Sequence, residues 1–78
     1  MEIWIVVEAN NIDYNISTSP GFNTEEEAKK YLKEMYEFHV DRIGNGNVEE
    51  SDFSNRMYRV LESGSSNLFY GEIHKINL

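Results

Sequence analysis

The first third of the chain follows the two-residue period that is typical of β-strands. Segment 2–8 is rich in Ile, Val and Trp, and segment 12–17 alternates apolar with polar residues. Because Asn tolerates the backbone of a tight turn, Asn10-Asn11 is predicted to join the two strands as a hairpin. The face expected to lie in the core comprises Ile3, Ile5, Val7, Ile12, Tyr14 and Ile16.

The middle of the chain changes to helical spacing of its apolar residues. Thr24 precedes three glutamates, and Glu27 stands where a capping box requires it. Gly44 is a suitable helix stop. The pattern therefore predicts one helix over about 25–43, with a charged outer side and an apolar stripe toward the core.

The remaining residues read as a polar, turn-rich segment (45–55) followed by two strands, 57–62 and 68–76, with a Gly/Ser turn between them. An alternative helical reading exists for 53–62, because its apolar residues also fit a helical stripe. The strand is preferred because an aromatic run follows the turn. The predicted fold is a single α+β domain over 1–78: a two-layer ββαββ arrangement with one helix packed on a four-stranded, mainly antiparallel sheet.

A single helix can cover only one face of such a sheet, and both the first strand and the last hairpin are apolar on both faces. With Ile3, Ile5 and Val7 assigned to the core, the opposite face would expose large apolar side chains, which monomers seldom leave bare. We therefore expect this face to bind a second copy or another protein. The expected partner-binding residues are Trp4, Val6, Tyr58, Leu68 and Tyr70.

Composition narrows the classes of partner. Fourteen acidic and seven basic residues give a net charge of −7, which argues against binding to nucleic acids and to anionic membranes. The sequence has no cysteine, so disulfides and thiolate metal sites are excluded. Without a recognisable signal peptide or apolar span, the chain is expected to be cytoplasmic.

One segment suggests metal chemistry. Residues 41–52 resemble the calcium loop of EF-hand proteins: Asp41, Asn45, Gly46 and Asp52 match its first, fifth, sixth and twelfth positions. The loop departs from that pattern at Ile43, which stands where an oxygen ligand belongs. Because of the matching positions, a calcium-binding protein is kept as an alternative function. Because of the departure at Ile43, no metal or cofactor is assigned.

Catalytic chemistry has no support in the sequence. His39 and His74 lie in no recognisable motif, and neither a nucleophile elbow nor a phosphate-binding loop is present. The preferred function is a non-enzymatic, self-associating or protein-binding module. A second alternative is an acidic mimic of nucleic acid that inhibits a DNA-binding protein, which rests on net charge alone.

Overall fold

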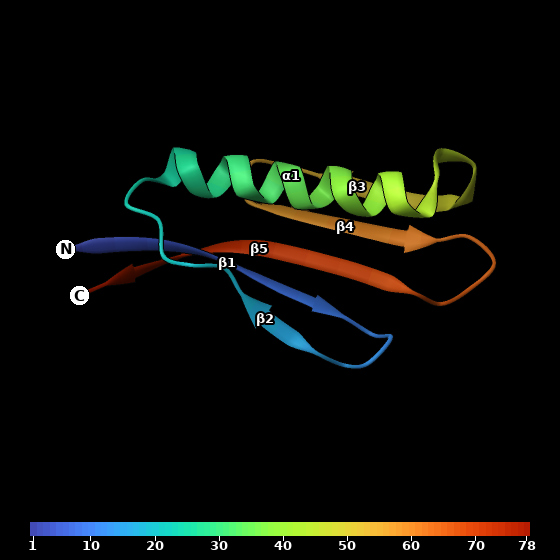
Figure 1. Cartoon of the computed structure of the whole chain (residues 1–78), viewed down its shortest axis with the longest axis horizontal. Coiled ribbons are helices and arrows are strands. Elements are labelled where there is room, and N and C mark those ends of the chain that lie inside the picture. The colour runs from blue at the N-terminus through green and yellow to red at the C-terminus, as the bar shows by residue number, and fades with distance from the viewer.

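A computed structural model describes the backbone of residues 1–78 and every side chain except that of Asn45. One helix lies against a single sheet, and the long strands run almost the whole length of the molecule (Figure 1). The elements in chain order are β1 (Glu2–Asn10), β2 (Ile16–Thr18), α1 (Glu25–Ile43), the one-turn 3-10 helix η1 (Asn45–Asn47), β3 (Val48–Phe53), β4 (Met57–Glu62) and β5 (Leu68–Asn77).

The sheet has the strand order β2-β1-β5-β4-β3, and every neighbouring pair is antiparallel. The predicted α+β class with one helix is confirmed, but the predicted count of four strands is wrong. The fifth strand is β3, which lies within the segment assigned to a polar loop and pairs with β4. The helical alternative for 53–62 is also wrong, because Met57–Glu62 forms the strand β4 between β3 and β5.

Local signals placed the helix correctly. α1 spans Glu25–Ile43, and the Thr24 hydroxyl accepts a hydrogen bond from the backbone N–H of Glu27. The helix ends at Gly44, whose φ of 90° lies in the region that favours glycine. Its amide donates back to the carbonyl of Val40.

The connection between β1 and β2 differs from the predicted two-residue turn. Asn10 begins a longer loop, since its side-chain oxygen accepts from the amides of Ile12 and Asp13. The side-chain amide of Asn11 donates to the backbone carbonyl of Ser66, which ties the loop to the β4–β5 turn. A two-residue turn at Asn10-Asn11 would pair Ala9 with Ile12. In the structure Ala9 pairs with Ile16 instead, Glu8 pairs with Ser17, and Val7 pairs with Thr18.

The helix covers the opposite face of the sheet from the one predicted. Val6 is fully buried beneath α1, and Trp4 packs against the same core, whereas Ile3, Ile5 and Val7 point to the uncovered side. The buried core consists of Val6, Ala28, Leu32, Tyr58, Val60 and Ile73.

Charged residues on the later strands explain this choice of face. β1 is apolar on both sides, but Arg59, Glu72 and His74 all lie on one side of the sheet. Burying these groups under a helix would remove them from water together with their partners, Glu50 for Arg59 and Glu72 for His74. The desolvation of such ions costs several kcal/mol each, which a buried ion pair seldom recovers in full. The helix packs instead over the side that carries Val6, Tyr58, Val60 and Ile73, on which β1 and β5 also carry Glu8 and Lys75.

Candidate functional site

The sheet surface opposite α1 is the first candidate site, and we call it the open face. No element of the described chain packs over it, because α1 and the chain leading into it lie on the other side of the sheet or along its edge (Figure 1). Apolar side chains from four strands meet there. They are Ile3, Ile5, Val7 and Ala9 of β1, Ile16 of β2, Met57 and Leu61 of β4, and Leu68, Tyr70 and Ile76 of β5.

The expected partner-binding residues are divided between the two faces. Leu68 and Tyr70 lie on the open face, as predicted. Val6 and Tyr58 are fully buried and Trp4 lies on the same, helix-covered side, so their assignment to an exposed face is wrong. The wrong face of β1 was assigned to the core, because this strand carries apolar residues on both faces and its pattern does not indicate which face the helix covers.

A polar cluster stands within this apolar surface. The Tyr70 hydroxyl donates to Glu72 at 2.7 Å, and Nε2 of His74 lies 2.6 Å from the other oxygen of Glu72. The hydrogen bonds from Tyr70 and His74 lower the pKa of Glu72. On the neighbouring strand, the guanidinium of Arg59 contacts Glu50 at 3.1 Å. The open face thus combines apolar area with acidic and basic groups.

The two sheet edges are poor docking sites. β2 is only three residues long, and β3 carries three acidic residues, Glu49, Glu50 and Asp52. Short or charged edge strands disfavour the addition of a further strand. A partner is therefore better accommodated on the open face than at an edge.

The segment that resembles a calcium loop does not adopt the continuous loop of an EF-hand. Asp41 lies in α1, whereas Glu49 and Asp52 lie in β3, so a helix end and an extended strand replace the expected loop. Among the described residues, no group of three or more acidic or histidine side chains is close enough to hold a metal ion.

A second site lies on the other side of the sheet, between α1 and the ends of β1 and β5. We call it the Glu8 cleft; its volume is about 290 Å³. Glu8, Gly71 and Tyr58 form one row across β1, β5 and β4. Because Gly71 has no side chain, the Tyr58 ring lies across it, and its hydroxyl donates to Glu8 at 2.9 Å. Tyr31 of α1 donates to the other Glu8 oxygen at 3.4 Å.

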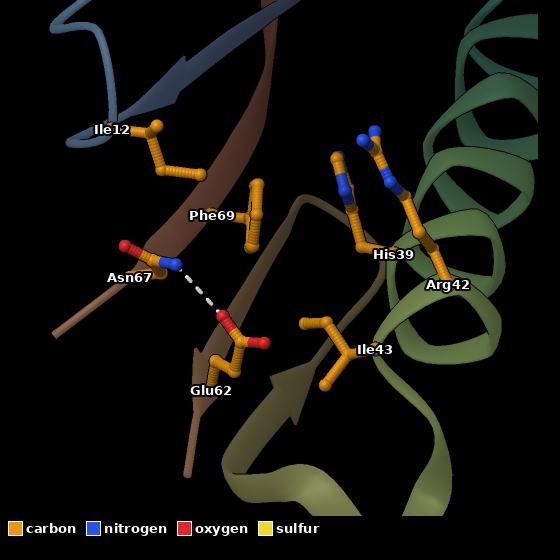
Figure 2. A pocket seen from close by; sticks show the side chains of 7 residues that line it. All are labelled: Ile12, His39, Arg42, Ile43, Glu62, Asn67 and Phe69. Atoms are coloured by element: carbon orange, nitrogen blue, oxygen red, sulfur yellow. Dashed lines mark hydrogen bonds between the residues drawn. The ribbon is translucent and has the colours of Figure 1, made fainter. Parts of the chain in front are cut away.

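His39 of α1 forms the wall of the Glu8 cleft together with Phe69 of β5. The two rings stack with centroids 4.4 Å apart and an interplanar angle of 22°. The same pair also lines an adjacent cavity of about 220 Å³, where Ile12 comes from the β1–β2 loop and Arg42 from the helix (Figure 2). In that cavity Glu62 accepts a hydrogen bond from Asn67 across the β4–β5 turn (Figure 2).

Burial perturbs two of these groups. Desolvation, reinforced by the nearby Glu8 charge, raises the pKa of Tyr58. Burial is also the main reason that the pKa of His39 is lowered, with Arg42 adding to the effect and Glu8 opposing it. Nδ1 of His39 is buried without a hydrogen-bond partner in the described structure. These groups are therefore neutral near pH 7.

This arrangement predicts that the protein loses stability in mild acid. His39 binds a proton more readily in the unfolded chain, where its pKa is near 6.5, than in the folded one. The contribution of neutral His39 to the free energy of unfolding is thus fully present above about pH 6.5. It declines as the pH falls through the pKa that His39 has in the folded protein, with a slope of at most about 1.4 kcal/mol per pH unit. Urea unfolding between pH 7.5 and 5.5 measures this decline. His39→Phe should flatten this part of the profile, and an unchanged slope in that variant would contradict the assignment.

Sequence reasoning did not find the Glu8 cleft. The signal available was a carboxylate at position 8 on the same strand face as Trp4 and Val6. Its partners Tyr31 and Tyr58 are 23 and 50 residues away, and nothing local connects them.

The fold and these two sites define a small α+β domain with an uncovered sheet face and a separate acidic cleft. Comparison of the chain with protein-family models, with curated proteins and with solved structures gave no match. In the described part of the chain, no helix combines the length and apolar character that a bilayer span requires.

Proposed function

We propose that this protein is a non-enzymatic interaction module that pairs with a second copy of itself through the open face. The observation that supports this proposal most is the apolar surface formed by β1, β4 and β5 on the side that lacks a helix. Such patches on small proteins mark interaction surfaces. The proposal keeps the function expected from the sequence but moves it to the opposite face of the sheet.

The dimensions of the open face approach those that contact with a second copy requires. β1 and β5 contain nine and ten residues, which gives a length of about 30 Å at roughly 3.3 Å per residue. The other three strands are shorter, with three residues in β2 and six each in β3 and β4, so at about 3.3 Å per residue and about 4.8 Å between strands the face covers on the order of 500 Å². This area lies just below the range of specific interfaces, which bury about 600–1,000 Å² on each partner.

The composition of the open face also suits an isologous contact. In a two-fold dimer the same patch must be complementary to itself. Ile5 and Val7 of β1 supply apolar side chains beside Glu72 and His74 of the middle strand β5, and Arg59 and Glu50 on the other side supply both signs of charge. Two sheets packed in this way form a sandwich in which each outer surface carries its own helix.

Self-association should strengthen as salt is added. Each copy carries a net charge of −7, and two such molecules repel each other at low ionic strength. Salt at 0.1 M screens charges beyond about 10 Å and removes much of this repulsion. A cationic protein partner would respond in the opposite direction, since salt weakens attraction between unlike charges.

The substitution Ile5→Lys tests the proposed dimer. It places an ammonium group on the open face, next to the middle strand β5, so we expect sedimentation equilibrium to give the monomer mass of 9.1 kDa where the wild type gives about twice that value. Phe38→Lys is the matched control, because Phe38 is 51% exposed on the helix. It makes the same change of charge away from the open face and should leave the dimer intact. If Phe38→Lys dissociates the protein and Ile5→Lys does not, the open face is not the interface.

A further inference from the structure

The Glu8 carboxylate is an unusual group in this structure because it is well shielded from water and lacks a cationic partner. Its side chain is only 13% exposed. In the described part of the chain, the one basic side chain within 4.0 Å is His39, whose Nε2 lies 4.0 Å from the nearer carboxylate oxygen. Because burial lowers the pKa of His39, this ring is neutral near pH 7. The carboxylate is therefore held by two tyrosine hydroxyls and no positive charge.

From this geometry we infer that the Glu8 cleft binds an organic ammonium group carried on a short aliphatic chain. A buried carboxylate without an ionic partner favours a ligand that supplies the missing charge. An ammonium nitrogen can lie at about 2.8 Å from both Glu8 Oε2 and His39 Nε2, because atoms 4.0 Å apart subtend about 90° at that position. The neutral imidazole and the carboxylate would then each accept a hydrogen bond from the ammonium group.

The walls of the cleft suit the remainder of such a ligand. Tyr31 and Phe69 supply aromatic surfaces, and aromatic faces attract cations and pack well against methylene groups. Met35 adds a flexible apolar side chain from α1. A volume of about 290 Å³ accommodates an alkyl chain of four or five carbons with its ammonium group. Such a group occurs both in free amines and in the lysine side chain of another protein.

Titration with n-butylammonium chloride tests the inference, with sodium chloride as the ionic-strength control. We expect saturable shifts in the NMR signals of Tyr31, His39 and Phe69, with millimolar affinity. Glu8→Gln should weaken binding at least about five-fold, since it removes the charge and keeps the shape. Glu34→Gln, on the exposed side of α1, removes the same charge elsewhere and should change affinity less than about two-fold. Equal weakening by both substitutions, or shifts that sodium chloride reproduces, would overturn the inference.

A second variant keeps the test informative if Glu8→Gln unfolds the protein. Ser17 of β2 pairs directly with Glu8 and lines the cleft. Ser17→Lys supplies a tethered ammonium group next to the carboxylate and should abolish binding of the butylammonium probe, whereas Ser17→Gln should retain it. Retained binding in Ser17→Lys would contradict the proposed site.

The source of the ammonium group is distinguished by a parallel titration with the peptide acetyl-Gly-Lys-Gly-amide. Both probes carry the same four-carbon ammonium chain. Binding of the peptide at least as tight as that of n-butylammonium identifies a lysine side chain as the natural occupant, and binding of the free amine alone identifies a small amine. Failure of both probes to saturate the Glu8 cleft excludes the site. None of these outcomes depends on the open face, so they are independent of the proposed dimer.

Discussion

Val6→Asp should unfold the protein, whereas Val7→Asp should leave it folded. Val6 is fully buried under α1 among Leu32, Tyr58 and Ile73, so a carboxylate there would lose its water and gain no partner. Placing an unpaired charge in a core costs more than about 4 kcal/mol, and a chain of 78 residues has a total stability of only about 4–12 kcal/mol. Circular dichroism and urea unfolding of the two variants measure the difference.

The neighbouring position is the matched control. Val7 has the same side chain on the same strand, but it points to the open face. An Asp there contacts water in the separated copy, so Val7→Asp is expected to dissociate the proposed dimer without unfolding the chain. The loss of β-propensity there costs about 1 kcal/mol. If Val7→Asp were the more destabilising of the two, the helix would lie on the other face of the sheet and the open face would be wrongly assigned.

Gly71→Ala should lower the free energy of unfolding by about 3 kcal/mol, even though it adds a single methyl group. A Cβ atom at position 71 would meet three atoms of the Tyr58 ring, two of them at 2.8 and 2.9 Å and the third still closer. Tyr58 is fully buried and cannot move aside without disturbing the core. Displacing its ring would also break the hydrogen bond from its hydroxyl to Glu8.

Two companion variants show whether the contact with Tyr58 is the cause. Gly46→Ala adds a methyl group where no atom lies within 4 Å, so it should be close to neutral. Tyr58→Val removes the ring and makes room beside Gly71. The double variant with Gly71→Ala should therefore cost clearly less than the sum of the two single substitutions, as expected for residues in contact. Simple additivity in urea unfolding would contradict the proposed packing.

Local signals in the sequence were sufficient for the helix and for β4. Thr24, the glutamates after it and Gly44 mark both ends of α1 through hydrogen bonds that form within a few residues. β4 could be identified because its alternation is followed by a Gly/Ser turn and an aromatic strand. These features depend on neighbours in the chain and not on the tertiary arrangement.

β3 could not be predicted because its strand character comes from its partner. Its sequence is mostly polar, and five of its six residues are exposed, so it lacks the apolar alternation of a half-buried strand. It forms because β4 offers a free edge beside it. The register of β2 was missed for a similar reason, since the side chains of Asn10 and Asn11 bond to residues that include the distant Ser66.

The face that α1 covers was predictable in principle, although not from β1. Ile5 pairs with His74 and Val7 pairs with Glu72, so two of the three acidic or basic residues of β5 lie on the side of β1 that stays open, and only Lys75 lies on the covered side. This inference needs the strand order and register, which the pattern of one strand does not contain. The Glu8 cleft depends on the same information, because Glu8 and Tyr58 meet only when β5 lies between β1 and β4 with Gly71 in the shared row.

The central claim, that two copies pack through the open face, is tested most directly by intermolecular NOEs. A mixed sample of ¹³C-labelled and unlabelled protein reports only contacts between different molecules. We expect NOEs that connect the methyl groups of Ile5, Val7 and Leu61 to the same region of the second copy, and none from Leu32 beneath the helix. Intermolecular NOEs confined to Ile12, Phe38 or other helix-side residues, or none at concentrations up to 1 mM, would contradict the claim.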